Sequence, residues 1–173
     1  MARTISSSDD VIDSRDIIAR KDELESERED LVSALDEARE ALSELQADEP
    51  PNSVQEDGED GEEFAAYEEK LSEAKQALLD ASNALDEWDE DNGEELKGLV
   101  ELCDEAPGDD WEHGATLINE SYFTDYCQEL VSDIGDLPKD IPGYLVIDWE
   151  ATANNLRADY TSVEWEGTTF YVR

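Results

Sequence analysis

An apolar position recurs every seven residues between residues 64 and 88, and this repeat constrains the fold more than any other feature of the sequence. Two rows of the heptad are filled in four successive repeats, by Phe64, Leu71, Leu78 and Leu85 in one row and by Tyr67, Ala74, Ala81 and Trp88 in the other. Rows three or four residues apart lie on one face of a helix. The repeat therefore predicts a long helix that packs a narrow seam against another helix.

A weaker repeat precedes this helix. It consists of Ile17, Leu24, Leu31, Ala38 and Leu45, with a companion row that is charged at Lys21 and Arg28 and becomes apolar at Leu35 and Leu42. Asp9 or Asp10 could cap the start of a helix here, and Asp13 and Asp16 suit the positive end of its dipole. We therefore expect a helical pattern throughout residues 9–90, broken only by a loop.

The expected loop is residues 47–62, which contain two prolines, two glycines and a block of acids. Two helices joined by a loop most simply form an antiparallel hairpin over residues 1–92, and a coiled coil between chains is the alternative. In either arrangement the seam consists of Leu24, Leu31, Leu35, Phe64, Tyr67, Leu71, Leu78, Leu85 and Trp88.

Residues 93–110 are predicted to be a connector, within which Glu94–Glu105 could form a short helix that ends before Pro107-Gly108. Residues 111–173 hold most of the aromatic side chains and are predicted to form a small α+β domain. The expected fold class is α+β, mainly α: a long helical hairpin or coiled coil, followed by a small α+β domain that ends in a β-hairpin.

Local signals define the elements of this last domain. Apolar residues at helical spacing predict a helix over Ser121–Ile134 with one broad buried face. Asp148 can cap a further helix, Trp149–Ala158. Alternation on either side of Gly167 predicts a terminal β-hairpin made of residues 162–166 and 168–172.

Charge limits the classes of partner. The 173 residues include 50 acids and 12 bases, a formal net charge of −38. Nucleic acid and anionic membranes bind basic surfaces, so we expect neither to bind directly, whereas a basic protein would be attracted. No apolar run approaches the roughly 18 residues that span a bilayer, and MARTISSSDD lacks the apolar core of a signal peptide. We expect a cytoplasmic protein in which Cys103 and Cys127 stay free thiols.

Motifs for chemistry are missing from the sequence. His113 is the single histidine and has no nucleophile motif beside it. In the acid-rich stretch 86–97, placing Gly93 at the sixth position of an EF-hand loop puts Trp88 and Leu99 where acids are required. No phosphate-binding glycine motif occurs. We therefore predict no catalytic residues, no metal site and no cofactor, and a protein that is not an enzyme.

Acidic residues are spread over the whole chain instead of forming a tail. On a helix, carboxylates three or four residues apart have Cβ atoms about 5–6 Å apart, in the range of phosphate spacing along a strand. Two functions fit: a DNA mimic, or an acidic coiled-coil scaffolding or interaction protein whose charge is a solubility or salt adaptation. The candidate partner-binding acids are Asp22, Glu23, Glu25, Glu27, Glu29, Asp30, Glu62, Glu63, Glu68, Glu69, Glu73, Asp86, Glu87, Asp89, Glu90, Asp133, Asp136, Asp148, Glu150 and Asp159.

The segments YFTDYCQELVSDIG and IDWEATANNLRADY, with the closing hairpin and its aromatic end, resemble the C-terminal region of ArdA-type antirestriction proteins, which phages and mobile elements carry. The resemblance covers residues 111–173. It implies an elongated, dimeric DNA mimic that occupies the DNA-binding groove of a restriction–modification enzyme. The N-terminal and central domains of that family have no counterpart in this sequence, where the predicted helical hairpin takes their place.

We therefore expect a non-enzymatic phage or mobile-element inhibitor that acts in the host cytoplasm. Its expected partner is a basic DNA-binding defence protein, either a restriction–modification enzyme or a CRISPR effector, for whose groove it competes with DNA. A homodimer is an alternative to a monomer, because the apolar seam could pair within one chain or between two.

Overall fold

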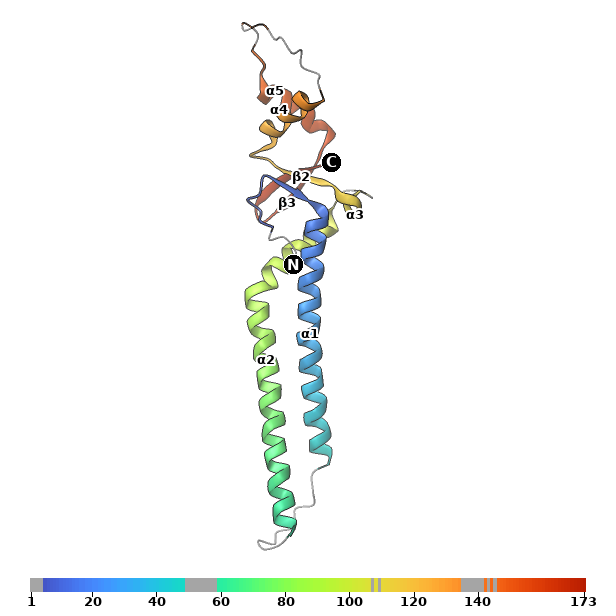
Figure 1. Cartoon of the computed structure of the whole chain (residues 1–173), viewed down its shortest axis with the longest axis vertical. Coiled ribbons are helices and arrows are strands. Elements are labelled where there is room, and N and C mark those ends of the chain that lie inside the picture. Colours follow the sequence, from blue (N-terminus) through green and yellow to red (C-terminus); the bar gives the residue numbers. More distant parts are fainter. Residues whose placement is uncertain are drawn as a thin grey trace. The chain divides into compact units, whose positions relative to one another are not determined.

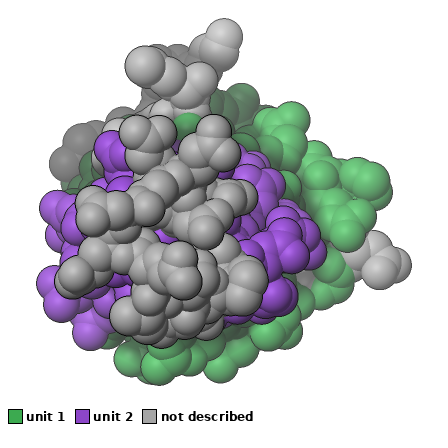
Figure 2. All heavy atoms as spheres, turned by 90° about the horizontal axis from the view of Figure 1, so that it is seen from below, with its two compact units in different colours: residues 1–23, 95–173 green, residues 24–94 purple. Residues whose placement is uncertain are grey.

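Two long helices make up most of the described chain: α1 (Ser14–Ala47) and α2 (Glu59–Glu105) (Figure 1). The chain divides into unit 1, residues 1–23 and 95–173, and unit 2, residues 24–94 (Figure 2). Together with a small antiparallel sheet, the helices give an α+β fold that is mainly helical, as predicted. The structure is a computed structural model that describes residues 5–48, 59–106, 108, 110–134, 142, 144 and 146–173, with the backbone alone for residues 59–63.

Unit 2 pairs its segments of α1 and α2 in antiparallel directions (Figure 1). The Arg28 guanidinium donates hydrogen bonds to the Asp89 carboxylate through Nε at 2.8 Å and Nη2 at 3.3 Å. Beside this pair, the Trp88 indole N–H donates to the Glu27 carboxylate at 3.2 Å. Residues about sixty positions apart are therefore held together across the two helices of a single chain.

The predicted seam residues all lie on α1 or α2. Leu24 and Leu35 are buried. The remaining seven are half-buried: Leu31, Phe64, Tyr67, Leu71, Leu78, Leu85 and Trp88. The burial is partial because several heptad positions hold only an alanine, which leaves a narrow apolar strip between two charged helices. These alanines are Ala38 on α1 and Ala74 and Ala81 on α2.

The start of the chain differs from the prediction. Residues 11–13 form strand β1 instead of the first turn of a helix, so Asp9 and Asp10 do not cap α1. The carboxylate of Asp13 accepts a hydrogen bond from the backbone N–H of Arg15 at 2.9 Å, which is the bond a capping side chain makes. A three-residue strand has too few residues to show an alternating pattern, so the heptad signal that follows it dominated the prediction.

Helix α2 also differs from the prediction. It begins at Glu59, inside the stretch expected to be loop, and continues to Glu105, so residues 94–105 are helical as predicted but extend α2 instead of forming a separate short helix. Gly93 lies inside the helix, where one glycine costs about 1 kcal/mol relative to alanine and does not end a strongly periodic segment. The rest of the expected loop, residues 49–58, lies outside the described residues.

Unit 1 contains a sheet with the strand order β1-β2-β4-β3, in which all neighbours are antiparallel. Glu166 and Gly167 connect β3 to β4 with positive φ angles of 49° and 74°, as a two-residue turn between twisted strands requires. The predicted terminal hairpin is confirmed, with its first strand starting one residue earlier. The strands are β1 (Val11–Asp13), β2 (Thr116–Asn119), β3 (Thr161–Trp165) and β4 (Thr168–Val172).

Strand β1 is bound firmly into this sheet. Ile12 pairs with Leu117, and the backbone N–H of Asn119 donates to the carbonyl of Asp10 at 2.9 Å. The buried Ser14 hydroxyl donates to the Trp111 carbonyl at 2.6 Å. The N-terminal residues therefore belong to the same unit as the C-terminal ones.

Two helices cover one face of the sheet: α4 (Phe123–Asp133) and α5 (Trp149–Leu156). Their side chains Phe123, Cys127 and Ala153 are buried together with Ile118 and Tyr171 of the sheet. The carboxylate of Asp148 accepts a hydrogen bond from the backbone N–H of Ala151 at 2.9 Å, which confirms the predicted cap of α5. A short helix, α3 (Trp111–Gly114), precedes β2, and a 3-10 turn, η1 (Arg157–Asp159), follows α5.

On the other face of the sheet, Ile12, Leu117, Phe170 and Val172 are buried. Trp165 is buried as well, and Gly98 of α2 faces its indole so closely that an added Cβ would lie 3.4 Å from Nε1. The sheet is therefore covered on both sides within unit 1, which gives this small domain a sizeable apolar core.

Arg157 lies among the aromatic rings of this core. Its guanidinium carbon is 4.8 Å from the ring centroid of Tyr171 and 5.6 Å from that of Phe123. Its Nε is buried and has no hydrogen-bond partner among the described residues. Burial, and then the hydrogen bond that the Tyr171 hydroxyl donates to Glu120 at 3.0 Å, raises the pKa of Tyr171. The ring faces therefore hold the Arg157 cation in place.

Among the described residues, no helix has a stretch both long enough and apolar enough to cross a lipid bilayer.

Candidate partner-binding surface

The net charge is large in both units. Unit 2 has 26 acids and 4 bases, a net charge of −22, and unit 1 has 24 acids and 8 bases, a net charge of −16. Ion pairs within the chain use several of the few cations, among them Arg20, which binds the Glu95 carboxylate at 2.8 Å, and Arg28. Most of the negative charge is therefore left for solvent or for a partner.

The predicted acids of α1 lie along one stretch of the helix. Glu25, Glu27, Glu29 and Asp30 are exposed, as is Asp22, which pairs with Lys21 at 3.0 Å. Glu23 is half-buried and accepts a hydrogen bond from Arg20 at 3.1 Å. Successive carboxylates project on several faces, so their field does not point in a single direction.

The predicted acids of α2 form two groups. Glu68, Glu69 and Glu73 are exposed near its start, and Asp86, Glu87 and Glu90 are exposed further along. Asp89 is half-buried in its pair with Arg28, which raises the pKa of the guanidinium and ties Asp89 to the hairpin. Glu62 and Glu63 lie on the helix, but their side chains are outside the described residues.

Unit 1 carries the remaining predicted acids. Asp133, Asp148, Glu150 and Asp159 are exposed on or beside α4, α5 and η1. Asp148 has a structural role as the cap of α5. Asp136 lies outside the described residues.

The charge density along unit 2 approaches that of DNA. Residues 24–47 of α1 carry eight acids and two bases, and residues 59–94 of α2 carry fourteen acids and two bases. At 1.5 Å per residue, these net charges of −6 and −12 are spread over about 36 and 54 Å. The contacts of Arg28 with Asp89 and of Trp88 with Glu27 place residues 24–47 beside about residues 69–92, which carry eight acids and two bases. Over this shared length of about 36 Å, the two helices present one net negative charge per about 3.0 Å, compared with one per about 1.7 Å along B-DNA.

A further group of acids is brought together by the fold without any local sign in the sequence. In unit 1, residues of α2 and of the β3–β4 hairpin line a hollow of about 330 Å³, and four of them are acids: Glu101, Glu105, Glu164 and Glu166. Glu101 pairs with Lys97 at 3.7 Å, and Glu166 accepts a hydrogen bond from the Ser7 hydroxyl at 2.8 Å. About sixty residues separate the two pairs of acids in the chain, and no local pattern indicates that they meet.

The one histidine lines a different hollow of unit 1, about 440 Å³ in volume, together with Cys103, Trp111 and Glu112. Burial raises the pKa of the Cys103 thiol, which disfavours the thiolate that a nucleophile requires. Both cysteines are free thiols, as predicted. Within the described ranges, no group of three or more His, Cys, Asp or Glu side chains is placed to hold a metal ion.

Comparison of the chain with protein-family models, with curated protein sequences and with solved structures finds no match.

Proposed function

We propose that this protein is a non-enzymatic phage or mobile-element inhibitor that mimics DNA. It competes with DNA for the basic groove of a host restriction–modification enzyme or CRISPR effector. The observation that carries the proposal is the charge density of unit 2, whose paired helices present more than half of the negative charge per unit length of a DNA duplex. The resemblance of residues 111–173 to ArdA-type proteins supports the same function.

The physical basis is exchange of one polyanion for another. A groove lined with Lys and Arg binds phosphates through charge and releases counterions when it does so. Carboxylates on rigid helices can take the same cationic partners, and Arg in particular binds a carboxylate with two parallel hydrogen bonds. Because the helices are folded before binding, little conformational entropy is lost when the groove closes on them.

The competing function is an acidic scaffolding protein whose charge serves solubility. The two functions differ in what happens to DNA. A mimic raises the apparent Kd of the enzyme for DNA in proportion to its own concentration, and excess DNA reverses the inhibition. A scaffold leaves DNA binding unchanged.

The test uses purified restriction–modification and CRISPR effector complexes, a labelled cognate duplex and the full chain as competitor. We expect at least one of these enzymes to release its DNA, with an inhibition constant that does not change as DNA is added. Inhibition that excess DNA cannot reverse, or unchanged DNA binding by every enzyme in both classes, would rule out the mimic.

A further inference from the structure

One part of unit 2 has no net charge, although the rest of the unit is strongly acidic. Residues 74–85 of α2 contain one acid, Asp80, and one base, Lys75, whereas the unit as a whole has 26 acids in 71 residues. On α1, residues 31–35 contain no charged side chain. We refer to residues 31–35 and 74–85 as the neutral belt.

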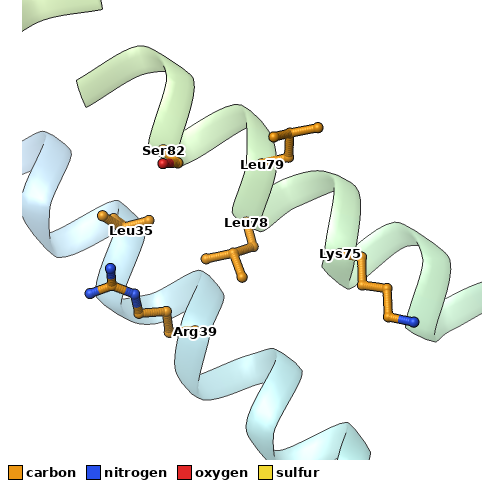
Figure 3. A pocket seen from close by; sticks show the side chains of 6 residues that line it. All are labelled: Leu35, Arg39, Lys75, Leu78, Leu79 and Ser82. Atoms are coloured by element: carbon orange, nitrogen blue, oxygen red, sulfur yellow. The ribbon is translucent and has the colours of Figure 1, made fainter. Parts of the chain in front are cut away.

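The two halves of the neutral belt meet at a hollow between the helices, about 320 Å³ in volume (Figure 3). Leu35 and Leu78 point into the space between α1 and α2, whereas Leu79 points away from α1 (Figure 3). Leu79 is 53% exposed, a large apolar surface for a helix so rich in charge. The lining residues are Leu35, Arg39, Lys75, Leu78, Leu79 and Ser82.

Leu79 lies in the middle of an exposed stripe on α2. Positions three or four residues apart share a face, and the exposed members of this stripe are Ser72, Lys75, Gln76, Leu79, Asp80 and Asn83, with the Gln76 amide donating to the Asp80 carboxylate at 2.7 Å. Beyond its two ends, α2 becomes acidic again, at Glu68 and Glu69 on one side and at Asp86 and Glu87 on the other. The stripe is thus a limited neutral area with an apolar centre.

We propose that the neutral belt binds a second copy of this chain, with the two α2 helices antiparallel and Leu79 of one copy against Leu79 of the other. Like charges opposite one another are destabilising, so two hairpins of net charge −22 can approach most closely where acids are fewest and Asp80 is balanced by Lys75. A basic partner is attracted to the acidic remainder of the hairpin, but the belt adds no electrostatic attraction for it. A second copy brings a matching neutral belt.

The symmetry of this pairing adds a charge contact. About a two-fold axis at Leu79, Lys75 of each copy lies opposite Asn83 of the other copy and one helical turn from its Asp86. Both copies make the same contacts, so the interface closes at two chains. One helix pair buries less than the roughly 1,200 Å² of a standard interface, so the dimer is weak.

Salt distinguishes this contact from binding to a basic partner. Raising NaCl from about 0.1 to 1 M shortens the Debye length from about 10 to 3 Å and screens the repulsion between the two acidic hairpins. Self-association through a belt without net charge therefore strengthens with salt, whereas binding through carboxylates weakens. The two proposals are independent, and failure of one leaves the other standing.

Sedimentation equilibrium of the full chain at low and high salt tests the proposal. We expect a monomer–dimer equilibrium whose dissociation constant falls as salt is added and rises by about tenfold or more in Leu79→Glu. Ala66→Glu is the matched control, because it adds the same charge at an exposed position of the same helix outside the belt. A monomer at every concentration and salt, or equal effects of the two variants, would overturn the proposal.

Oxidative cross-linking locates the contact directly. Leu79→Cys should form a covalent dimer much faster than Ala66→Cys, because the two copies of residue 79 meet at the axis. If Leu79→Glu instead abolished binding to another protein while the chain stayed monomeric, the belt would be the site of that protein, and the proposed dimer would be wrong.

Discussion

Arg157 shows how an acidic chain uses one of its few cations inside a core. Its guanidinium lies 4.8 Å from the centroid of Tyr171, where the ring face attracts it and its methylenes add apolar packing. No local pattern in the sequence indicates this role, since Arg157 follows α5 and Tyr171 lies in β4. The position of the side chain depends on how the helix and the strand pack.

Arg157→Met keeps the aliphatic packing and removes the cation. We expect it to lower the free energy of unfolding of unit 1 by about 1–2 kcal/mol, the range for a desolvated cation–π contact. Arg173→Met is the control, because it removes the same charge from an exposed residue whose guanidinium is 5.8 Å from the Tyr160 ring. Urea denaturation followed by tryptophan fluorescence measures both, and equal losses would contradict the assigned role.

Cys127 is a second residue whose chemistry depends on burial. The side chain is fully buried, and burial raises the pKa of its thiol. Because the pKa of this thiol is higher in the folded than in the unfolded chain, burial of the neutral thiol contributes fully to the free energy of unfolding below the ordinary thiol pKa of about 8.5. This contribution is lost as the pH rises through the folded pKa. We expect iodoacetamide to modify Cys127 far more slowly in the native protein than in urea, and more slowly than the half-buried Cys103. Equal rates, read by peptide mass spectrometry, would contradict this.

At the scale of elements, strand β1 closes one edge of the sheet. Ile12 is 2% exposed and pairs with Leu117, whereas its neighbour Val11 is 37% exposed. The strand joins residues at opposite ends of the chain, so the stability of unit 1 depends on residues that precede the long helices.

Truncating Ile12 measures this dependence. Ile12→Ala should lower the free energy of unfolding by about 2–4 kcal/mol, the range for emptying a buried aliphatic site. The matched variant Val11→Ala should cost less than about 1 kcal/mol, because that side chain is largely solvated. If both variants unfolded at the same urea concentration as the natural chain, β1 would not be part of the core.

Helix α2 contains two glycines in different surroundings. Gly93 has no atom within 4 Å of the Cβ position, whereas a Cβ at Gly98 would lie 3.4 Å from Trp165 Nε1. Gly93→Ala should therefore raise the free energy of unfolding by up to about 1 kcal/mol through helix propensity. Gly98→Ala should raise the free energy of unfolding by less than Gly93→Ala or should lower it, because the Trp165 indole must shift to make room for the new methyl group. Thermal unfolding by circular dichroism compares them, and a larger gain at Gly98 would contradict the packing described.

The sequence predicted those elements that local signals define. Four heptads indicate α2, Asp148 caps α5 through a bond within one turn, and Gly167 supplies the positive φ of the terminal hairpin. β1 and the hollow lined by Glu101 and Glu164 were not predicted, because both depend on residues far apart in the chain. The acids of the candidate surface were predictable as exposed helix positions, but which of them pair with Arg20 or Arg28 was not.

At the scale of the whole molecule, charge dominates. A net charge of −38 on 173 residues opposes folding by self-repulsion, and the cost is offset by the core of unit 1 and the ion pairs of unit 2. Screening this repulsion should raise the melting temperature as NaCl is added, most of all between low salt and about 0.1 M. An unchanged melting temperature in calorimetry would show that the repulsion is already neutralised within the fold.

DNA mimicry, as proposed above, requires the carboxylates of the hairpin to replace DNA phosphates in a basic groove. Its most direct test is displacement of labelled DNA from a susceptible restriction–modification enzyme or CRISPR effector by three forms of the full chain. The first form is the natural chain. In the second form, five exposed acids are replaced by the corresponding amides. In the third form, the same five positions keep their charge, because each Asp becomes Glu and each Glu becomes Asp. The five are Glu29, Asp30, Glu68, Glu69 and Glu73.

We expect that at least about tenfold more of the amide variant is needed to displace DNA, while the charge-keeping variant matches the natural chain. We also expect displacement by the natural chain to weaken at least about tenfold as NaCl rises from about 0.1 to 0.3 M. Equal displacement by all three forms, with no dependence on salt, would contradict DNA mimicry.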